Sequence, residues 1–241
     1  MITTKTIEYH DGKTVLEGYY AEDTTDTTKS GKKPLVLIAH DWTGRNEFAC
    51  DKAKKLAELG YIGFALDMFG KGILGKNKEE KSALITPFVQ DRSLLQQRIT
   101  SALQTASNLA NVDTQRIAAI GFCFGGLCVL DLARCDAPIK GVVSFHGLLN
   151  APEKQTIKPF KAKVLALHGH DDPMVQPDQV LAFEKEMTTA KADWQVYVYG
   201  RTMHGFTNPE ANDPGFGTVF NPLTTQRAWT AMRNFFAEIF A

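Results

Sequence analysis

The feature that most constrains this chain is a cysteine bracketed by glycines, Gly121-x-Cys123-x-Gly125, directly after the apolar run 116–120. A strand that ends in this pattern must turn sharply into a helix, and the central residue takes a strained backbone conformation. Positions two before and two after it are crowded, so glycine fits there best. The helix directs its first N–H groups at Cys123, which favours a thiolate. Alternatively, Cys123 is a small buried hydrophobic residue.

An acid and a histidine follow Cys123, each directly after a predicted strand. The apolar run 162–167 is typical of a buried strand and precedes Asp171 and Asp172. The next strand-like run, 194–199, precedes the loop that holds His204. Nucleophile, acid and histidine in this order form the catalytic triad of the α/β-hydrolase fold.

The chemistry requires each member of this triad. A cysteine of ordinary pKa, about 8.5, is only a few per cent thiolate at neutral pH. A neighbouring imidazole stabilises the thiolate, and a carboxylate behind the imidazole fixes its tautomer. We expect Asp172 to be this carboxylate, because Gly169-x-x-Asp172-x-x-Val175 places it after a tight turn while the valine packs inward. Asp171 is then a turn or cap residue. His204 is the expected base, with surface solvation or a capping hydrogen bond as its alternative roles.

The pattern His168-x-His170-x-Asp172 allows a rival interpretation, since it overlaps the start of a metal-dependent hydrolase motif. Pro173 stands where that motif requires another histidine. The remaining histidines show no second spaced pair; they are His10, His40, His146 and His204. We expect no metal, with His168 and His170 as packing and hydrogen-bonding residues, and keep the metal-dependent hydrolase as an alternative.

Composition is compatible with one large α/β domain over residues 1–241, because 44% of the residues are hydrophobic and no repeat occurs. With 27 basic and 27 acidic residues, nothing indicates a nucleic acid or membrane partner. The amino terminus lacks the apolar core of a signal peptide, and no apolar run approaches membrane-spanning length. The four cysteines have neither disulfide-scaffold nor zinc-site spacing. We expect a cytoplasmic protein.

Strands and helices alternate along the chain, which predicts a mostly parallel, doubly wound sheet flanked by helices, preceded by a hairpin that turns at Asp11-Gly12. We expect strands at 7–10, 14–20, 35–39, 61–66, 116–120, 139–147, 162–167 and 194–199. We expect helices at 51–59, within 81–109 with a break or start near Pro87, after Cys123, and at 224–240. Residues 22–33 are expected to be a solvated loop. Ligand sites in such sheets lie at the carboxyl ends of the strands.

On these motifs the chain resembles the dienelactone hydrolase family over essentially its whole length. The matching motifs are the Gly-x-Cys-x-Gly-Gly elbow, the Gly-x-x-Asp-x-x-Val acid turn and the segment His204-Gly205-Phe206. The resemblance implies an α/β-hydrolase fold, no cofactor, and an acyl-enzyme mechanism that uses Cys123, Asp172 and His204. It also implies an oxyanion hole formed by the backbone N–H groups of Phe124 and Trp42.

Two positions depart from the pattern of the family. In the loop after the first core strand, well-studied members carry a glutamate that couples to the cysteine. This chain has Asp41 at that position. Asp41 either couples to Cys123 or caps its own loop. Those members also carry an arginine for a substrate carboxylate four residues after the histidine, where this chain has Asn208. Recognition of a carboxylate is therefore not predicted, and segment 208–217 is expected to border the pocket.

A cysteine nucleophile restricts the substrates, because the group of lower pKa leaves a tetrahedral intermediate more readily. A thiolate is therefore expelled again unless the leaving group of the substrate is good. We expect a carboxymethylenebutenolidase-like hydrolase of activated carboxylic esters or lactones, acting on small molecules as a monomer or small homo-oligomer. The alternative is a catalytically weak ligand-binding protein on the same fold.

Overall fold

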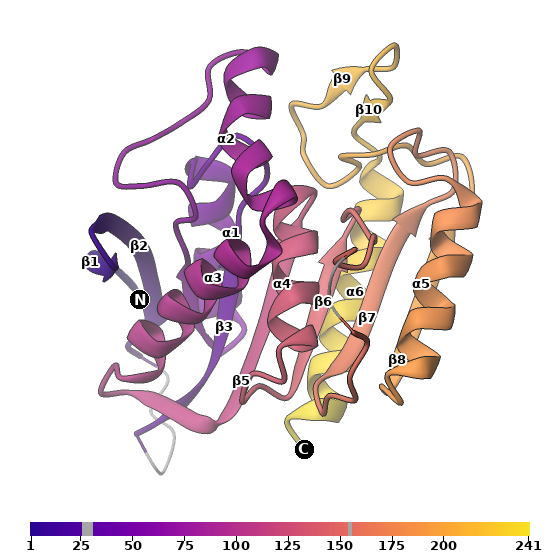
Figure 1. The fold of residues 1–241 in the computed structure, drawn as a ribbon. Coiled ribbons are helices and arrows are strands. Elements are labelled where there is room, and N and C mark those ends of the chain that lie inside the picture. The colour runs from indigo at the N-terminus through magenta and orange to yellow at the C-terminus, as the bar shows by residue number, and fades with distance from the viewer. Residues whose placement is uncertain (26–30, 154–155) are drawn as a thin grey trace. The chain divides into compact units, whose positions relative to one another are not determined.

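The computed structural model describes residues 1–25, 31–153 and 156–241 (Figure 1). Its strands are β1 (Ile2–Asp11), β2 (Thr14–Asp23), β3 (Lys33–Ala39), β4 (Ile62–Ala65), β5 (Val112–Phe122), β6 (Gly141–Phe145), β7 (Lys163–Gly169), β8 (Trp194–Tyr199), β9 (Asn212–Asp213) and β10 (Thr218–Val219). Its helices are α1 (Glu47–Glu58), α2 (Lys78–Gln90), α3 (Arg92–Ser107), α4 (Phe124–Arg134), α5 (Pro177–Thr189) and α6 (Pro222–Ile239).

The predicted fold class is confirmed: strands β1 to β8 form a mostly parallel sheet, in the order β1-β2-β4-β3-β5-β6-β7-β8, with flanking helices. The chain divides into two compact units, Met1–Ile120 and Gly121–Ala241. The boundary between the units falls inside β5 and not in a connecting segment. The expectation of one domain over 1–241 stays a prediction.

In the first unit, the predicted hairpin is present, with β1 and β2 antiparallel around Gly12, whose φ is 57°. Strand β4 pairs antiparallel with β2 and parallel with β3. Residues 35–39 of β3 are all buried, as their apolar sequence predicts. The predicted solvated loop 22–33 is wrong at its two ends, because Glu22 belongs to β2, Lys33 belongs to β3 and both side chains are buried. Residues 26–30 of this loop lie outside the described residues.

The long segment 81–109 contains two helices, and the break between them lies at Asp91, four residues after Pro87. Asp91 has extended backbone angles, and its carboxylate accepts hydrogen bonds from Ser93 N and Leu94 N, so it caps α3. Pro87 lies inside α2, near its end. The Asp91 cap determines where α3 begins, because it satisfies N–H groups that have no partner within the helix.

In the second unit, β6, β7 and β8 are parallel and adjacent. Alternate residues of β6 point to opposite faces. Ser144 lies against Gly126 of α4, whereas the ring of Phe145 lies 6.3 Å from that of Trp229 in α6. Helices α4 and α6 therefore cover opposite faces of β6, as Figure 1 shows. Across the described ranges, none of the helices has the length and apolar character that crossing a membrane requires.

Close packing of α1 on β4 gives a test of the fold. A Cβ atom on Gly63 would lie 2.4 Å from Ala53 O and 2.7 Å from Ala53 Cα. We expect Gly63→Ala to lower the free energy of unfolding by about 1–3 kcal/mol, because α1 must shift away from the strand. Urea unfolding followed by circular dichroism measures the change.

Gly200→Ala is the matched control, because nothing lies within 4 Å of a Cβ atom at that position. Its free energy of unfolding should stay within about 0.5 kcal/mol of the wild-type value. Equal stabilities for the two variants would contradict the packing of α1 against β4.

Candidate active site

The turn between β5 and α4 has the strained geometry that its sequence predicts. Cys123 lies at the turn with φ 55° and ψ −116°, a conformation that non-glycine residues rarely adopt. A Cβ atom on Gly121 would lie 1.9 Å from Gly125 O, so the two flanking glycines are in direct backbone contact. No side chain fits between them, which is why this turn requires glycine at those positions.

Hydrogen bonds and close packing connect this turn to the end of β6. Cys123 N donates to Phe145 O at 3.1 Å, and Gly126 N donates to Cys123 O at 3.0 Å. A Cβ atom on Gly126 would lie 2.5 Å from Gly147 Cα, so α4 contacts the backbone after β6. These contacts hold Cys123, which is half-buried, at the N-terminal end of α4.

The predicted acid and base contact each other. Asp172 Oδ2 accepts a hydrogen bond from His204 Nδ1 at 2.7 Å, and both side chains are buried. The other carboxylate oxygen, Oδ1, accepts from Met174 N at 2.8 Å. Asp171 is exposed, and its N–H donates to Thr202 O. Of the two neighbouring acids, it is therefore Asp172 that orients the histidine.

Cys123 acts on His204 mainly through its charge. Burial alone would lower the pKa of His204. Four influences outweigh burial and raise that pKa to about 10; they are the charge of Cys123, the hydrogen bond with Asp172, a weaker contact with the Cys123 sulfur and the charge of Asp172. Within the described part of the chain, no atom meets the distance and angle of an ordinary hydrogen bond to His204 Nε2. The contact with Cys123 is thus looser than the bond to Asp172, and the imidazole is protonated at neutral pH.

His146 packs against His204, a contact that no sequence motif indicates. It follows β6 with φ 39°, and its Nε2 lies 2.7 Å from Thr207 Oγ1. Its ring meets those of His204 and Phe206 edge-on, with centroids 5.1 and 5.0 Å apart. The available sequence signal was a histidine at the carboxyl end of a predicted strand, but its partners lie about 60 residues away.

The residues of the alternative metal motif, His168, His170 and Asp172, do not form a metal site in the structure. His168 is buried at the end of β7, where burial lowers its pKa against the opposing charge of Asp172. His170 is exposed. Asp172 contacts His204 and Met174. Among the residues that the structure describes, no three His, Cys, Asp or Glu side chains come close enough to hold a metal ion.

Asp41 and Trp42 lie in the loop after β3, in the first unit. Asp41 Oδ1 accepts from Thr43 N at 2.8 Å, which fits the loop-capping alternative. The loop is fixed by His40, whose Nε2 accepts from Met68 N and whose Nδ1 therefore donates to Asp41 O at 2.6 Å. Burial lowers the pKa of His40, so it is neutral. Coupling of Asp41 to Cys123 and a role for the N–H of Trp42 stay predictions, as does the role of Phe124, the first residue of α4.

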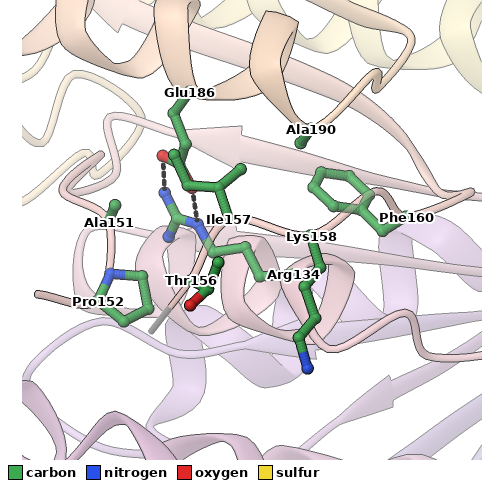
Figure 2. A pocket seen from close by; sticks show the side chains of 9 residues that line it. All are labelled: Arg134, Ala151, Pro152, Thr156, Ile157, Lys158, Phe160, Glu186 and Ala190. Carbon is green, nitrogen blue, oxygen red and sulfur yellow. Dashed lines mark hydrogen bonds and ion pairs between the residues drawn. The ribbon is translucent and has the colours of Figure 1, made fainter. Parts of the chain in front are cut away.

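A small cavity in the second unit contains none of the predicted site residues (Figure 2). Its volume is about 30 Å³, enough for water but not for an ester substrate. The guanidinium of Arg134 at its wall donates to both carboxylate oxygens of Glu186, each at 2.8 Å, and to Leu149 O at 3.0 Å. Arg134 and Glu186, two of the charged residues that line this cavity, therefore pair with each other and join α4 to α5.

The family model of the dienelactone hydrolase family matches residues 16–240. This chain belongs to the dienelactone hydrolase family. The crystal structure of a dienelactone hydrolase-like promiscuous phosphotriesterase from metagenomic libraries is 36% identical, with a TM-score of 0.93, and the match covers 99% of this chain and 98% of that one. The predicted fold and family are therefore confirmed, and the chain is a hydrolase of carboxylic esters or lactones.

Two curated relatives carry related names. A Bradyrhizobium protein named "Probable 2-oxo-3-(5-oxofuran-2-ylidene)propanoate lactonase" is 26% identical, and the match covers 83% of this chain and 82% of that protein. A Yersinia pestis protein named "Putative carboxymethylenebutenolidase" is 24% identical, and the match covers 87% of this chain and 79% of that protein.

The raised pKa of His204 predicts how catalysis depends on pH. The imidazolium persists above neutral pH and is lost as the pH rises through about 10, so kcat/KM for an activated aryl ester should fall through an alkaline limb centred there. Stopped-flow assays corrected for spontaneous hydrolysis measure it. The residual activity of His204→Ala should lack this limb. A limb centred near the ordinary imidazole value, about 6.5, would contradict the pairing of His204 with Cys123 and Asp172.

Proposed function

We propose that this chain hydrolyses activated carboxylic esters and lactones through an acyl-enzyme intermediate on Cys123. The observation that carries the proposal is the arrangement in the second unit. A strained cysteine at the N-terminal end of α4 acts electrostatically on His204, which donates a 2.7 Å hydrogen bond to buried Asp172. The proposal assigns these residues three roles: Cys123 is the nucleophile, His204 is the acid–base group and Asp172 orients His204.

In the proposed reaction, the Cys123 thiolate attacks the substrate carbonyl, and the N–H groups of Phe124 and Trp42 stabilise the oxyanion. His204 gives its proton to the departing alcohol or enol oxygen as the C–O bond breaks. Water then attacks the thioester while His204 takes a proton from it, and the carboxylic acid leaves. Asp172 stabilises the imidazolium at both ends of the cycle.

The substrate class follows from the competition between two leaving groups. A tetrahedral intermediate formed by a thiolate collapses forward only when the leaving group competes with the thiolate. Enol-lactones, aryl esters and thioesters meet this condition, whereas amides and simple alkyl esters meet it poorly. The names of the lactonase and butenolidase relatives support this class. The promiscuous phosphotriesterase relative adds a phosphotriester to the panel of substrates to be assayed.

Recognition of a substrate carboxylate is not part of the proposal. Asn208 stands where the resemblance leads one to expect an arginine, and its side chain accepts from Glu210 N at 3.0 Å, which shapes its own loop. We infer a small-molecule substrate and no nucleic-acid partner from the balanced charge. We also infer a cytoplasmic enzyme, because oxidation disables a thiol nucleophile, and a monomer or small homo-oligomer.

Substitution of the two central residues tests the mechanism. Cys123→Ser should lower kcat on the order of a hundredfold or more with little change in KM, because a hydroxyl depends more on a general base than a thiol does. His204→Ala should cost a similar factor. The double variant should lose little more, because triad members act as a unit. Steady-state kinetics with an aryl ester measure all three. If the losses in kcat of the two single variants multiply in the double variant, the two residues do not share one mechanism. The same conclusion holds if either single variant keeps wild-type turnover.

Chelation and alkylation separate this proposal from its alternatives. A chelator should leave the rate unchanged, and alkylation of Cys123 should abolish it. Loss of activity on chelation, restored by zinc, would favour the metal-dependent hydrolase of His168, His170 and Asp172. A Cys123 thiol that reacts no faster than a model thiol, together with no turnover of any ester in the panel, would favour a ligand-binding protein.

A further inference from the structure

The segment after His204 folds into a hairpin that the sequence pattern does not predict. We call residues 211–220 the clasp hairpin. Its strands β9 and β10 pair antiparallel, with Thr218 opposite Asp213. Phe220 N donates to Ala211 O at 2.9 Å at the base of the hairpin, and Phe216 N donates to Asp213 Oδ1 at 2.9 Å near the tip. The hairpin is therefore hydrogen-bonded along its length.

The returning strand of the clasp hairpin holds the backbone of His204. Val219 N donates to His204 O at 3.0 Å, and Thr218 forms a parallel β-bridge with His204. Just beyond the hairpin, Asn221 N donates to Phe206 O at 3.0 Å. The main chain on both sides of Gly205 is thus fixed by residues that follow it in the sequence.

The tip of the clasp hairpin touches the turn that carries Asp172. Gly217 has φ 84°, and a Cβ atom built on it would lie 2.1 Å from Pro173 Cγ and 2.5 Å from Pro173 Cδ. Gly217 therefore packs directly on the proline ring that follows the acid. A proline ring cannot rotate away as a flexible side chain does, so a side chain at position 217 must separate the hairpin from the acid turn.

The two ends of the Asp172–His204 hydrogen bond lie on separate loops. On the side that precedes Asp172, Asp171 N donates to Thr202 O at 2.9 Å and ties the acid turn to the His204 loop. On the side that follows Asp172, the clasp hairpin supplies the contact through Gly217 and Pro173. The carboxylate and the imidazole are thus held from both sides.

We propose that the clasp hairpin is a positioning element of the active site, and that Gly217 is its positioning residue. By packing on Pro173 while β10 holds His204, it fixes the distance between acid and base. This inference rests on the proposed function, in which Asp172 and His204 work on Cys123. A misplacement of about 1 Å at a catalytic group can cost on the order of a hundredfold in rate.

Gly217→Ala tests the proposal in the full-length enzyme. We expect kcat for an activated aryl ester to fall between about tenfold and a hundredfold, with KM within about twofold of wild type. The substitution slows the chemical step and leaves substrate binding unchanged. The low-field proton NMR signal of the His204–Asp172 hydrogen bond should shift or broaden in the variant. A purely structural glycine would change neither kcat nor this signal in a folded protein.

Two control variants separate contact from backbone strain. Gly200→Ala adds a methyl group without a contact, because nothing lies within 4 Å of a Cβ atom at that position. Gly12→Ala has the same kind of backbone strain, with φ 57°, and nothing within 4 Å of its Cβ. Both should retain wild-type kcat. A fall in kcat in either control equal to that in Gly217→Ala would overturn the proposal.

A compensating change provides the strongest test. Pro173→Ala removes Cγ and Cδ, which lie in the space that a methyl at 217 would take, and leaves Cβ at an acceptable 3.5 Å. The Gly217→Ala/Pro173→Ala protein should recover most of the lost kcat and the low-field NMR signal. A folded double variant that remains as slow as Gly217→Ala would overturn the proposal. If Gly217→Ala does not fold, Pro173→Ala alone should lower kcat several-fold, and an unchanged kcat would overturn it.

Failure of the clasp and failure of the proposed function give different results. If Cys123→Ser and alkylation leave turnover intact, the cysteine mechanism fails, whatever Gly217 does. If turnover depends on Cys123 but kcat and the NMR signal are unchanged in Gly217→Ala, only the clasp fails.

Discussion

The buried hydrogen bond between Asp172 and His204 is the interaction on which the rest of the site depends. Burial by itself disfavours an imidazolium, so the partners of His204 decide its protonation. Asp172 can be a partner because Met174 N occupies its second oxygen and fixes the turn. His204 is held in position for this bond because β10 is hydrogen-bonded to its backbone and His146 packs against its ring. Each of these contacts restrains one end of the same 2.7 Å bond.

Local steric rules made much of this arrangement predictable from sequence. The glycines around Cys123 predict the sharp turn, because their backbones lie too close for any side chain. The cysteine, the acid and the histidine follow β5, β7 and β8, which places them at the carboxyl ends of parallel strands. The choice of Asp172 over Asp171 came from turn chemistry. In the structure Val175 is buried and Asp172 is hydrogen-bonded to His204, while the catalytic role of Asp172 stays a prediction.

Two features that sequence did not predict depend on contacts between distant segments. The clasp hairpin has short strands, and its defining contact joins Gly217 to a proline more than 40 residues earlier. His146 looked like an ordinary strand-end histidine until folding placed it beside Thr207 and His204. One departure is local: the break expected near Pro87 lies four residues later, at Asp91, because the Asp91 carboxylate caps α3.

The central claim is that the acyl group of the substrate passes through Cys123. The most direct test is rapid acid quenching of the enzyme with an aryl ester whose acyl group is hydrolysed slowly, followed by intact mass measurement and peptide mapping. We predict a mass increase of one acyl group, carried as a thioester on the peptide that contains Cys123. An acyl group on any other residue, or complete turnover by protein alkylated at Cys123, would contradict this account.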